Sequence, residues 1–323
     1  MSHFLFAAPR SVTVCAYFLL TVCLLPLPAC SGDDAPTSTL PPEDSTHTID
    51  SGIVYLAPVT LCTIDDKRLA EISGIAPSRL RDGLYWLHND SGGEARLFAV
   101  DTNGITLATC ELLGTANRDW EDLASVTLNG TAWLYVGDIG DNDKKYATVS
   151  VSRIREPQVQ ANWRDSTITA AAETAVFRYP DGAHDCEALM VDPRDGGILL
   201  LEKNGTSCGV YAAAWPGAGG EAALQRIAAF RLPFEFSLWR LVTGADMHPG
   251  SRRIAVRTYT AVLEYLAPAG STPAALFDST AVQNISTPGL TQAEAVCYSR
   301  DGRDILTTSE GVNPPLLIIR RSD

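Results

Sequence analysis

Basic residues are scarce in this sequence of 323 residues. It contains 25 Lys and Arg against 38 Asp and Glu, which gives a formal net charge of −13 at pH 7. A surface of that sign repels nucleic acid and anionic lipid unless a bound cation reverses the sign locally, so we expect no nucleic-acid partner. Helical patterns are also missing: no segment beyond residue 52 carries a useful apolar stripe at helical spacing, which favours an all-β fold.

Cysteines are few and never closely spaced. Five follow Cys30 in the chain, namely Cys62, Cys110, Cys186, Cys208 and Cys297. Because none forms a Cys-x-x-Cys pair, neither a thiol redox centre nor a structural zinc site is indicated. An odd number leaves at least one thiol unpaired. We expect most of them in the core, with Cys186 and Cys208 as the favoured pair if a disulfide forms.

The N-terminus is typical of an export signal. Arg10 precedes an apolar run from Val12 to Pro28, and Ala29 places a small residue directly before Cys30. This pattern predicts a lipoprotein signal peptide over residues 1–30 with lipidation at Cys30, and an ordinary signal peptide is the alternative. The run is shorter than the roughly 20 apolar residues of a membrane span. We therefore predict an exported protein anchored to the cell envelope by lipid alone, at the outer membrane if the host has one.

The folded part of the chain is expected to begin near residue 53. Residues 31–52 are rich in Pro, Ser, Thr and Asp and nearly free of large apolar side chains, so they predict a disordered tether. Residues 53–323 are then long enough for one large β domain.

One unit recurs five times in that domain. Each copy begins with small or acidic residues that lead into an apolar segment, followed by a turn and further short strands. The copies begin at Glu71, Glu121, Glu187, Gly244 and Glu294. Such irregular spacing suits units of four antiparallel strands, and it predicts a β-propeller with five four-stranded blades. Six blades are the alternative if the long second unit hides another, and two β-sandwiches are the remaining one.

The ends of the repeat indicate how the ring closes. The fifth unit ends after its third strand, and a spare strand over residues 54–64 precedes the first unit. We predict that this N-terminal strand completes the last blade.

Unusual polar residues fall where they would share one face of the propeller. The inner strand of a blade begins, and the second strand ends, at the same mouth of the central channel. Crowded carboxylates there favour a hard cation such as Ca²⁺, which binds about six to eight oxygens. The predicted metal ligands are Glu71, Asp90, Glu121, Asp138, Asp141, Glu187, Asp246 and Glu294. The bland alternative is that the Asp and Asn residues of 138–143 are turn formers.

A second set of side chains is predicted to bind a ligand around this mouth. Its members are His88, Asn89, Asp119, Asp122, Asn142, Lys203, Arg257, Tyr259 and Glu310. The stretch from His88 to Gly93 places Ser91 near a histidine, but it lacks a Gly-x-Ser-x-Gly elbow and does not indicate serine catalysis.

These motifs resemble those of a known group of proteins. The segments Glu71-Ile-Ser-Gly-Ile-Ala, His88-Asn-Asp-Ser-Gly, Asp119-Trp-Glu-Asp-Leu-Ala and Gly137-Asp-Ile-Gly-Asp-Asn resemble those of secreted bacterial propellers of uncharacterised function. More distantly, they are similar to the phytase-like ("esterase-like activity of phytase") and SdiA-regulated propellers. The resemblance implies a calcium-dependent or calcium-stabilised propeller with phosphoester or ester hydrolase activity. The sequence departs from a phytase site in its few basic residues at the mouth, chiefly Lys203 and Arg257.

Two functions are therefore expected to compete. The first is a non-catalytic, monomeric module that binds a small molecule or a protein at the acidic mouth, with a structural cation. The second is a metal-dependent hydrolase, in which the cation polarises a phosphoryl or acyl oxygen and a carboxylate acts as the base. We favour the first, because the sequence forces no pair of nucleophile and base.

Overall fold

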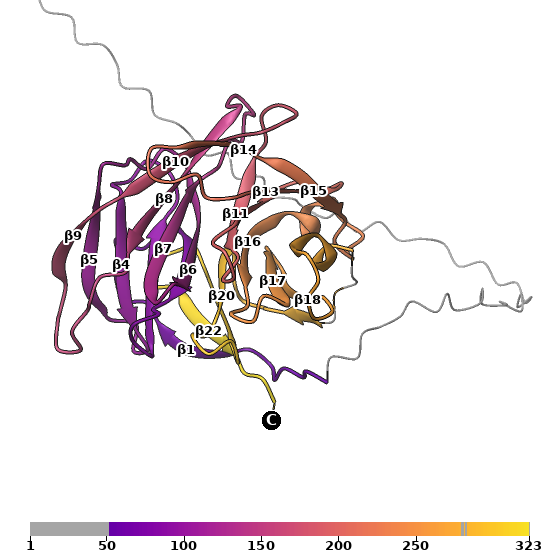
Figure 1. The fold of residues 1–323 in the computed structure, drawn as a ribbon. Coiled ribbons are helices and arrows are strands. Elements are labelled where there is room, and N and C mark those ends of the chain that lie inside the picture. Colours follow the sequence, from indigo (N-terminus) through magenta and orange to yellow (C-terminus); the bar gives the residue numbers. More distant parts are fainter. Residues whose placement is uncertain (1–51, 279–280, 282, 323) are drawn as a thin grey trace, which may run out of the picture. The chain divides into compact units, whose positions relative to one another are not determined.

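The strands of the chain form a five-bladed β-propeller, as predicted (Figure 1). The structure is a computed structural model that describes residues 52–278, 281 and 283–322. The predicted signal peptide, Cys30 and all but the last residue of the predicted tether lie outside these residues. Among the described residues, no helix has the length and apolar character needed to cross a membrane.

Each blade is an antiparallel sheet of four strands, counted outward from the channel. Blade 1 contains β2 (Ile72–Pro77), β3 (Leu84–Asn89), β4 (Arg96–Asp101) and β5 (Thr106–Leu113). Blade 2 contains β6 (Trp120–Leu128), β7 (Thr131–Asp138), β8 (Thr148–Arg155) and β10 (Glu173–Arg178). Blade 3 contains β11 (Cys186–Val191), β12 (Ile198–Glu202), β13 (Cys208–Ala213) and β15 (Gln225–Phe230). Blade 4 contains β16 (Val242–Met247), β17 (Arg253–Thr258), β18 (Ala261–Leu266) and β19 (Gln283–Ser286). Blade 5 contains β20 (Ala293–Tyr298), β21 (Ile305–Ser309), β22 (Pro315–Ile319) and β1 (Val59–Thr63).

Two additional strands pair with the outer edges of blades 1 and 2, and the first of them accounts for the long second unit. β9 (Ser166–Ala171) leaves blade 2 and pairs in parallel with β5 of blade 1. β14 (Glu221–Ala223) likewise leaves blade 3 and pairs in parallel with β10 of blade 2. Each of these strands pairs with the outer strand of the preceding blade. Because the extra residues of the second unit form β9, they do not form a sixth blade.

The N-terminal strand closes the ring, which confirms the predicted closure. β1 pairs antiparallel with β22, and Tyr55 forms an isolated bridge with Arg321. The Tyr55 hydroxyl donates a hydrogen bond of 3.0 Å to Oε1 of the buried Glu264. The same oxygen forms an ion pair with Arg253 at 3.0 Å. The N-terminal segment is thus fixed to blade 4 as well as to blade 5.

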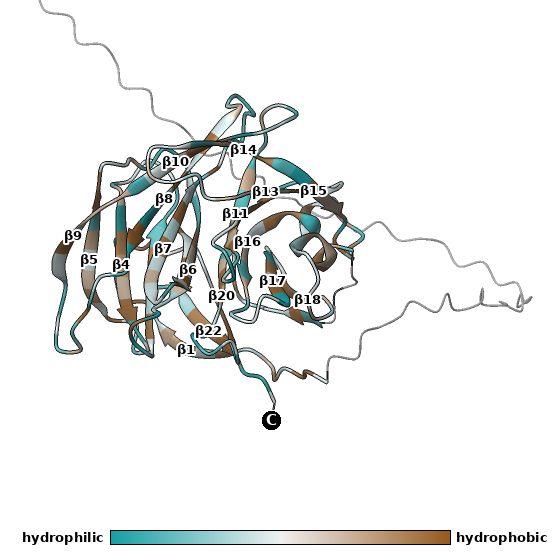
Figure 2. Ribbon diagram, in the orientation of Figure 1, coloured by the Kyte–Doolittle hydropathy of each residue, from teal (hydrophilic) through white to brown (hydrophobic). Residues whose placement is uncertain are grey.

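Apolar layers fill the spaces between the blades, and Figure 2 shows apolar residues along the strands. Cys186 lies in the layer shared by blades 2 and 3, whereas Cys208 lies in the layer shared by blades 3 and 4. The favoured disulfide is therefore wrong, because the two side chains lie on opposite faces of blade 3. All five cysteines of the described part of the chain are free thiols.

A bulge near the start of every inner strand positions the candidate site. In each blade the first residue of the inner strand pairs with the end of the second strand, and the register then shifts. A bulge adds one unpaired residue and redirects its side chain. The residues that follow the first paired position are Ser73, Glu121, Glu187, Thr243 and Glu294.

Candidate functional site

The five bulge residues occupy equivalent positions at the mouth, and all are buried. Three of them are glutamates whose charges interact with one another, Glu121 with Glu187 and Glu187 with Glu294. The other two are hydroxyl residues that bond to the backbone of the next inner strand. The Ser73 hydroxyl donates to the Glu121 carbonyl, and the Thr243 hydroxyl donates to the Ala293 carbonyl at 2.9 Å.

This arrangement corrects the predicted ring at two positions. Glu71 precedes β2 and is exposed, and Ser73 occupies the bulge of blade 1 in its place. Asp246 is the fifth residue of β16, deep in the blade, and its Oδ2 accepts a hydrogen bond from the Tyr298 amide at 2.8 Å. Thr243 occupies the bulge of blade 4. Aligning the five repeats by sequence places acidic residues at equivalent positions. The backbone register instead makes Ser73 and Thr243 equivalent to the glutamates of the other three blades.

An acidic triad forms where blades 1 and 2 meet. Asp90 directly follows β3, Asp119 directly precedes β6, and Glu121 is the bulge residue of β6. One carboxylate oxygen from each residue lies within 4.8 Å of the other two. The backbone around them is fixed: the Asp90 amide donates to the Glu71 carbonyl at 2.8 Å, and the Asn117 side-chain amide donates to the Asp90 carbonyl at 2.7 Å. Asp90 and Asp119 are partly exposed, so the triad opens toward solvent.

The three carboxyl groups hold protons more tightly than isolated acids do. Burial, and then repulsion from Asp90, raises the pKa of Asp119 to about 6. Burial raises the pKa of Glu121 well above its ordinary value, and the charges of Glu187, Asp90 and Asp119 add to the effect. Burial likewise raises the pKa of Asp90. The cause is that each ionised carboxylate loses hydration and meets further negative charge.

The basic groups near the triad are already engaged with other carboxylates. Lys203 donates to Glu187 at 2.8 Å, and its ammonium lies 5.5 Å from the centre of the Tyr259 ring. Arg118 forms an ion pair of 3.2 Å with Asp138. Despite its lysine partner, burial raises the pKa of Glu187 to about 7.

A second pair of carboxyl groups lies on the blade 5 side of the mouth. Glu294 interacts with Glu310, which follows β21, and burial together with the charge of Glu310 raises the pKa of Glu294 to about 9. Ionising both groups would place two negative charges in a buried site, which favours the protonated form of Glu294.

The predicted Asp-rich loop over residues 138–143 has a different role. Asp138 accepts a hydrogen bond from the Asp119 amide at 3.1 Å, and Asp141 accepts one from the Tyr146 amide at 2.6 Å. Asn142 is exposed. Neither aspartate belongs to the triad: Asp138, the last residue of β7, accepts from the residue that precedes β6, and Asp141 accepts a backbone hydrogen bond within its own loop.

Several predicted ligand-binding residues are fully buried. His88 lies in edge contact with the Trp120 ring, and burial lowers its pKa to about 4, so the imidazole is neutral. Asp122 accepts hydrogen bonds from the amides of Leu123, Leu189 and Ala245 and so ties blades 2, 3 and 4 together. Arg257 is 0% exposed and donates to the Thr287 hydroxyl at 2.6 Å. Asn89 is partly buried at the end of β3, and its side chain bonds to the Arg68 carbonyl.

Sequence reasoning missed a glycine that shapes the triad. A Cβ atom added to Gly140 would lie 2.1 Å from Oε1 of Glu121 and 2.6 Å from Oδ2 of Asp119. Only glycine therefore allows the two carboxylates to approach this loop. The signal in the sequence is a Gly between Ile139 and Asp141, but its meaning depends on a contact between segments about 20 residues apart.

The chain contains one Gly-x-Ser-x-Gly match, at residues 205–209. It lies between β12 and β13, so it has the strand-to-strand context of a hairpin. A nucleophile elbow requires a turn from a strand into a helix. The match does not indicate a nucleophilic serine.

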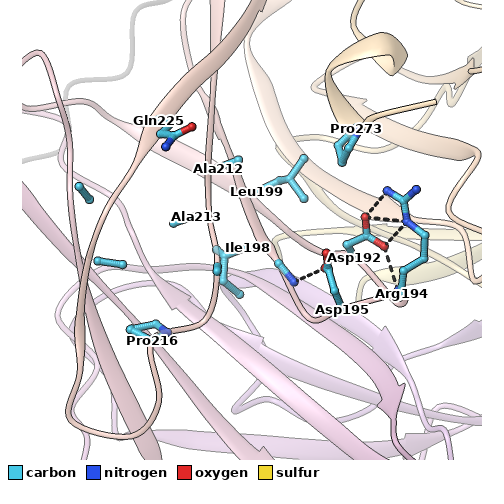
Figure 3. A pocket seen from close by; sticks show the side chains of 14 residues that line it. Asp192, Arg194, Asp195, Ile198, Leu199, Ala212, Ala213, Pro216, Gln225 and Pro273 are labelled. Carbon is cyan, nitrogen blue, oxygen red and sulfur yellow. Dashed lines mark hydrogen bonds and ion pairs between the residues drawn. The ribbon is translucent and has the colours of Figure 1, made fainter. Parts of the chain in front are cut away.

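A sizeable cavity lies away from the triad. It has a volume of about 590 Å³ and lies at the end of β11 and the start of β12, on the face opposite the acidic mouth. Figure 3 shows the Asp192–Arg194 ion pair at one side of it and Ile198, Ala213 and Pro216 at the other. Its lining is mostly apolar, with Arg194 neutralised by Asp192, so it holds no set of metal-binding or proton-transferring groups.

No protein-family model matches the chain, and no similar sequence is found among curated proteins. The fold is therefore shown by the structure alone.

Proposed function

We propose that the protein is a ligand-binding propeller whose acidic mouth holds a divalent cation at Asp90, Asp119 and Glu121. The observation that carries this proposal is the convergence of three carboxylates within 4.8 Å. Arg118 and Lys203, whose charges act on Asp119 and Asp90, are ion-paired with Asp138 and Glu187. A bound cation would neutralise the three carboxylates more fully than these engaged groups do.

Calcium is the cation that fits this donor set best. All three donors are carboxylate oxygens, which hard cations prefer to softer nitrogen or sulfur ligands. Two oxygens bound to one calcium ion lie at most about 5 Å apart, and all three pairs of triad oxygens fall within that limit. Calcium also tolerates irregular geometry, whereas magnesium demands a near-ideal octahedron. The partial exposure of Asp90 and Asp119 leaves coordination positions for water or for an oxygen of a ligand.

Isothermal titration of the purified protein with CaCl₂ and with MgCl₂ tests the cation site. We expect one calcium ion per chain, tighter binding of calcium than of magnesium, and at least tenfold weaker binding in Glu121→Gln. Asp143→Asn is the matched control, because Asp143 is exposed, paired with Lys145 and outside the triad. If the Glu121→Gln variant binds calcium like the wild type, the proposed site is wrong.

A metal-dependent phosphoester or ester hydrolase is the second candidate. It is favoured by one observation: Asp90 and Asp119 are partly exposed, which leaves positions on the cation open for a phosphoryl or acyl oxygen of a substrate. A screen of phosphomonoester and carboxylester substrates, with calcium and with chelator, tests it. Turnover that is lost in Asp119→Asn would support the hydrolase. The absence of turnover on every substrate would contradict it, and the binding module would remain as the proposed function.

We also propose that the chain is exported and held in the cell envelope by a lipid on Cys30. The support is the order of Arg10, the apolar run and Ala29 before that cysteine. Cys30→Ala should yield a folded protein that no longer partitions with membranes. Unchanged membrane association of this variant would contradict the lipid anchor.

A further inference from the structure

One loop on the mouth face exposes three large apolar side chains within four residues. Residues 231–241 join β15 to β16, and within them Phe236, Leu238 and Trp239 are 59%, 69% and 45% exposed. Isolated exposed apolar residues are ordinary, whereas a contiguous group marks a surface that contacts something else. The proposed cation site does not use this group.

The loop is held in this conformation by buried contacts. The Arg240 side chain is 6% exposed and donates hydrogen bonds to the carbonyls of Phe234, at 2.5 Å, and of Glu235. It also donates to the Gly205 carbonyl at 3.0 Å. A Cβ atom on Gly205 would lie 2.7 Å from the Ser237 carbonyl oxygen, so the two loops are in close contact. The hydrogen bonds of the buried Arg240 side chain thus hold the loop in the conformation that exposes its apolar side chains.

The loop lies beside the acidic mouth. Gly205 is two residues beyond Lys203, which pairs with the bulge residue Glu187, and the loop leads directly into the inner strand of blade 4. Two other loops of the same face also expose large apolar side chains, Tyr146 between β7 and β8 and Val312 between β21 and β22. We call Tyr146, Phe236, Leu238, Trp239 and Val312 the apolar rim.

We propose that the apolar rim and the acidic mouth together dock a segment of a partner protein that carries Lys or Arg next to aromatic or aliphatic side chains. Charge complementarity selects this occupant. Arg231 and Glu235 of the loop are both exposed and offset each other, so the negative charge comes from the mouth: Glu71 and Glu310 reach the same face, while Lys203 and Arg118 are neutralised by ion pairs. An anionic membrane or nucleic acid would meet this negative charge unfavourably. Aromatic side chains in such a position supply much of the binding energy of protein interfaces.

This inference rests on the proposed role as a binding module, and it does not require the cation. The two ideas can fail separately, because Phe236, Leu238 and Trp239 are not in the triad.

Selection from a random 12-residue peptide library displayed on phage, against the full-length protein, tests the docking surface. We expect enriched peptides that combine Lys or Arg with Trp, Phe or Leu. Synthetic copies should bind at least tenfold more weakly to Phe236→Ser/Trp239→Ser, and several-fold more weakly when NaCl rises from 50 to 500 mM. Peptides without basic residues, peptides that bind the double variant as tightly as the wild type, or no enrichment at all would overturn the proposal.

Matched controls separate the surface from the fold and from the cation site. Leu80→Ser/Ile105→Ser changes exposed apolar residues on turns of the opposite face and should bind the peptides like the wild type. Because the rim side chains are exposed, the rim variant should melt like the wild type, and the single Trp239→Ser variant repeats the test if it does not. Phe236→Ser/Trp239→Ser should lose peptide binding and keep calcium binding, because neither residue belongs to the triad. Rim-dependent sedimentation with phosphatidylcholine vesicles, without peptide binding, would show that the rim docks on lipid instead.

Discussion

Protons should compete with calcium at the acidic triad, and the competition should be visible as a pH-dependent change in melting temperature. Burial raises the pKa of Asp119 to about 6 and that of Glu187 to about 7. A carboxyl group whose pKa is raised by folding stabilises the protein fully below its unfolded pKa, near 4, and this stability is lost as the pH rises through the folded pKa. Without calcium, these groups therefore destabilise the fold increasingly between about pH 4 and pH 7.

Two histidines act in the opposite direction. Burial lowers the pKa of His88 and of His248 to about 4, so each contributes stability that grows as the pH rises toward the unfolded value near 6.5. The melting temperature at a single condition mixes both effects. The difference between calcium and chelator at the same pH isolates the triad, because the histidines contribute equally to both curves.

The size of this difference follows from mass action. At pH 7.5, calcium at about a hundredfold excess over its dissociation constant stabilises the folded state by about 2.7 kcal/mol. For a domain of this size that raises the melting temperature by roughly 5 to 10 °C. At pH 5, one unit below the pKa of Asp119, the proton on this group alone lowers the apparent affinity about tenfold, and protons on Glu121 and Asp90 lower it further. At the same calcium concentration the stabilisation then falls to about 1.4 kcal/mol or less, which at least halves the shift.

Differential scanning calorimetry at pH 5, 6, 7 and 7.5 measures the difference between the melting temperatures with calcium and with chelator. The gap between the two melting temperatures should widen with pH in the wild type and in Asp143→Asn. It should be small at every pH in Glu121→Gln, which lacks one anionic ligand. A gap of equal size at pH 5 and pH 7.5 would refute the competition, and no gap at any pH would refute the calcium site.

Three other changes test the fold and the site. Deleting residues 53–64 should expose the edge of β22 and remove the buried Ile64, lowering the melting temperature by at least about 5 °C or causing aggregation; an unchanged melting curve would contradict the closure. Gly140→Ala places a methyl group against two triad carboxylates, and a calcium titration should show binding at least tenfold weaker than in the wild type. A variant that binds calcium normally would show that the loop moves to accommodate the methyl group. Of the five free thiols in the described domain, only the partly exposed Cys62 should react with a thiol reagent under native conditions, and slowly, because burial raises its pKa to about 11; rapid reaction of the other four would contradict their burial.

The fold could be predicted from the sequence because the same local pattern recurs five times. The spacing of the copies limits each unit to about four strands, and the spare strand before residue 64 identifies its partner by what the fifth copy lacks. The long second unit was ambiguous, since a sequence cannot show that β9 pairs with the previous blade. The Cys186–Cys208 pair failed for a related reason: alternate side chains of a blade enter different apolar layers.

The sequence by itself determined that carboxylates gather at one mouth of the channel, because strand order alone places the starts of inner strands and the ends of second strands on one face. Only the tertiary structure decided which of them meet. Each inner strand has a bulge after its first paired residue, and the residue in that bulge is Ser73 rather than Glu71, and Thr243 rather than Asp246. The triad joins Asp90 of blade 1 to Asp119 and Glu121 of blade 2, and Gly140 admits them. Their closeness, and the raised pKa values that follow from it, depend on contacts between blades that no local pattern encodes.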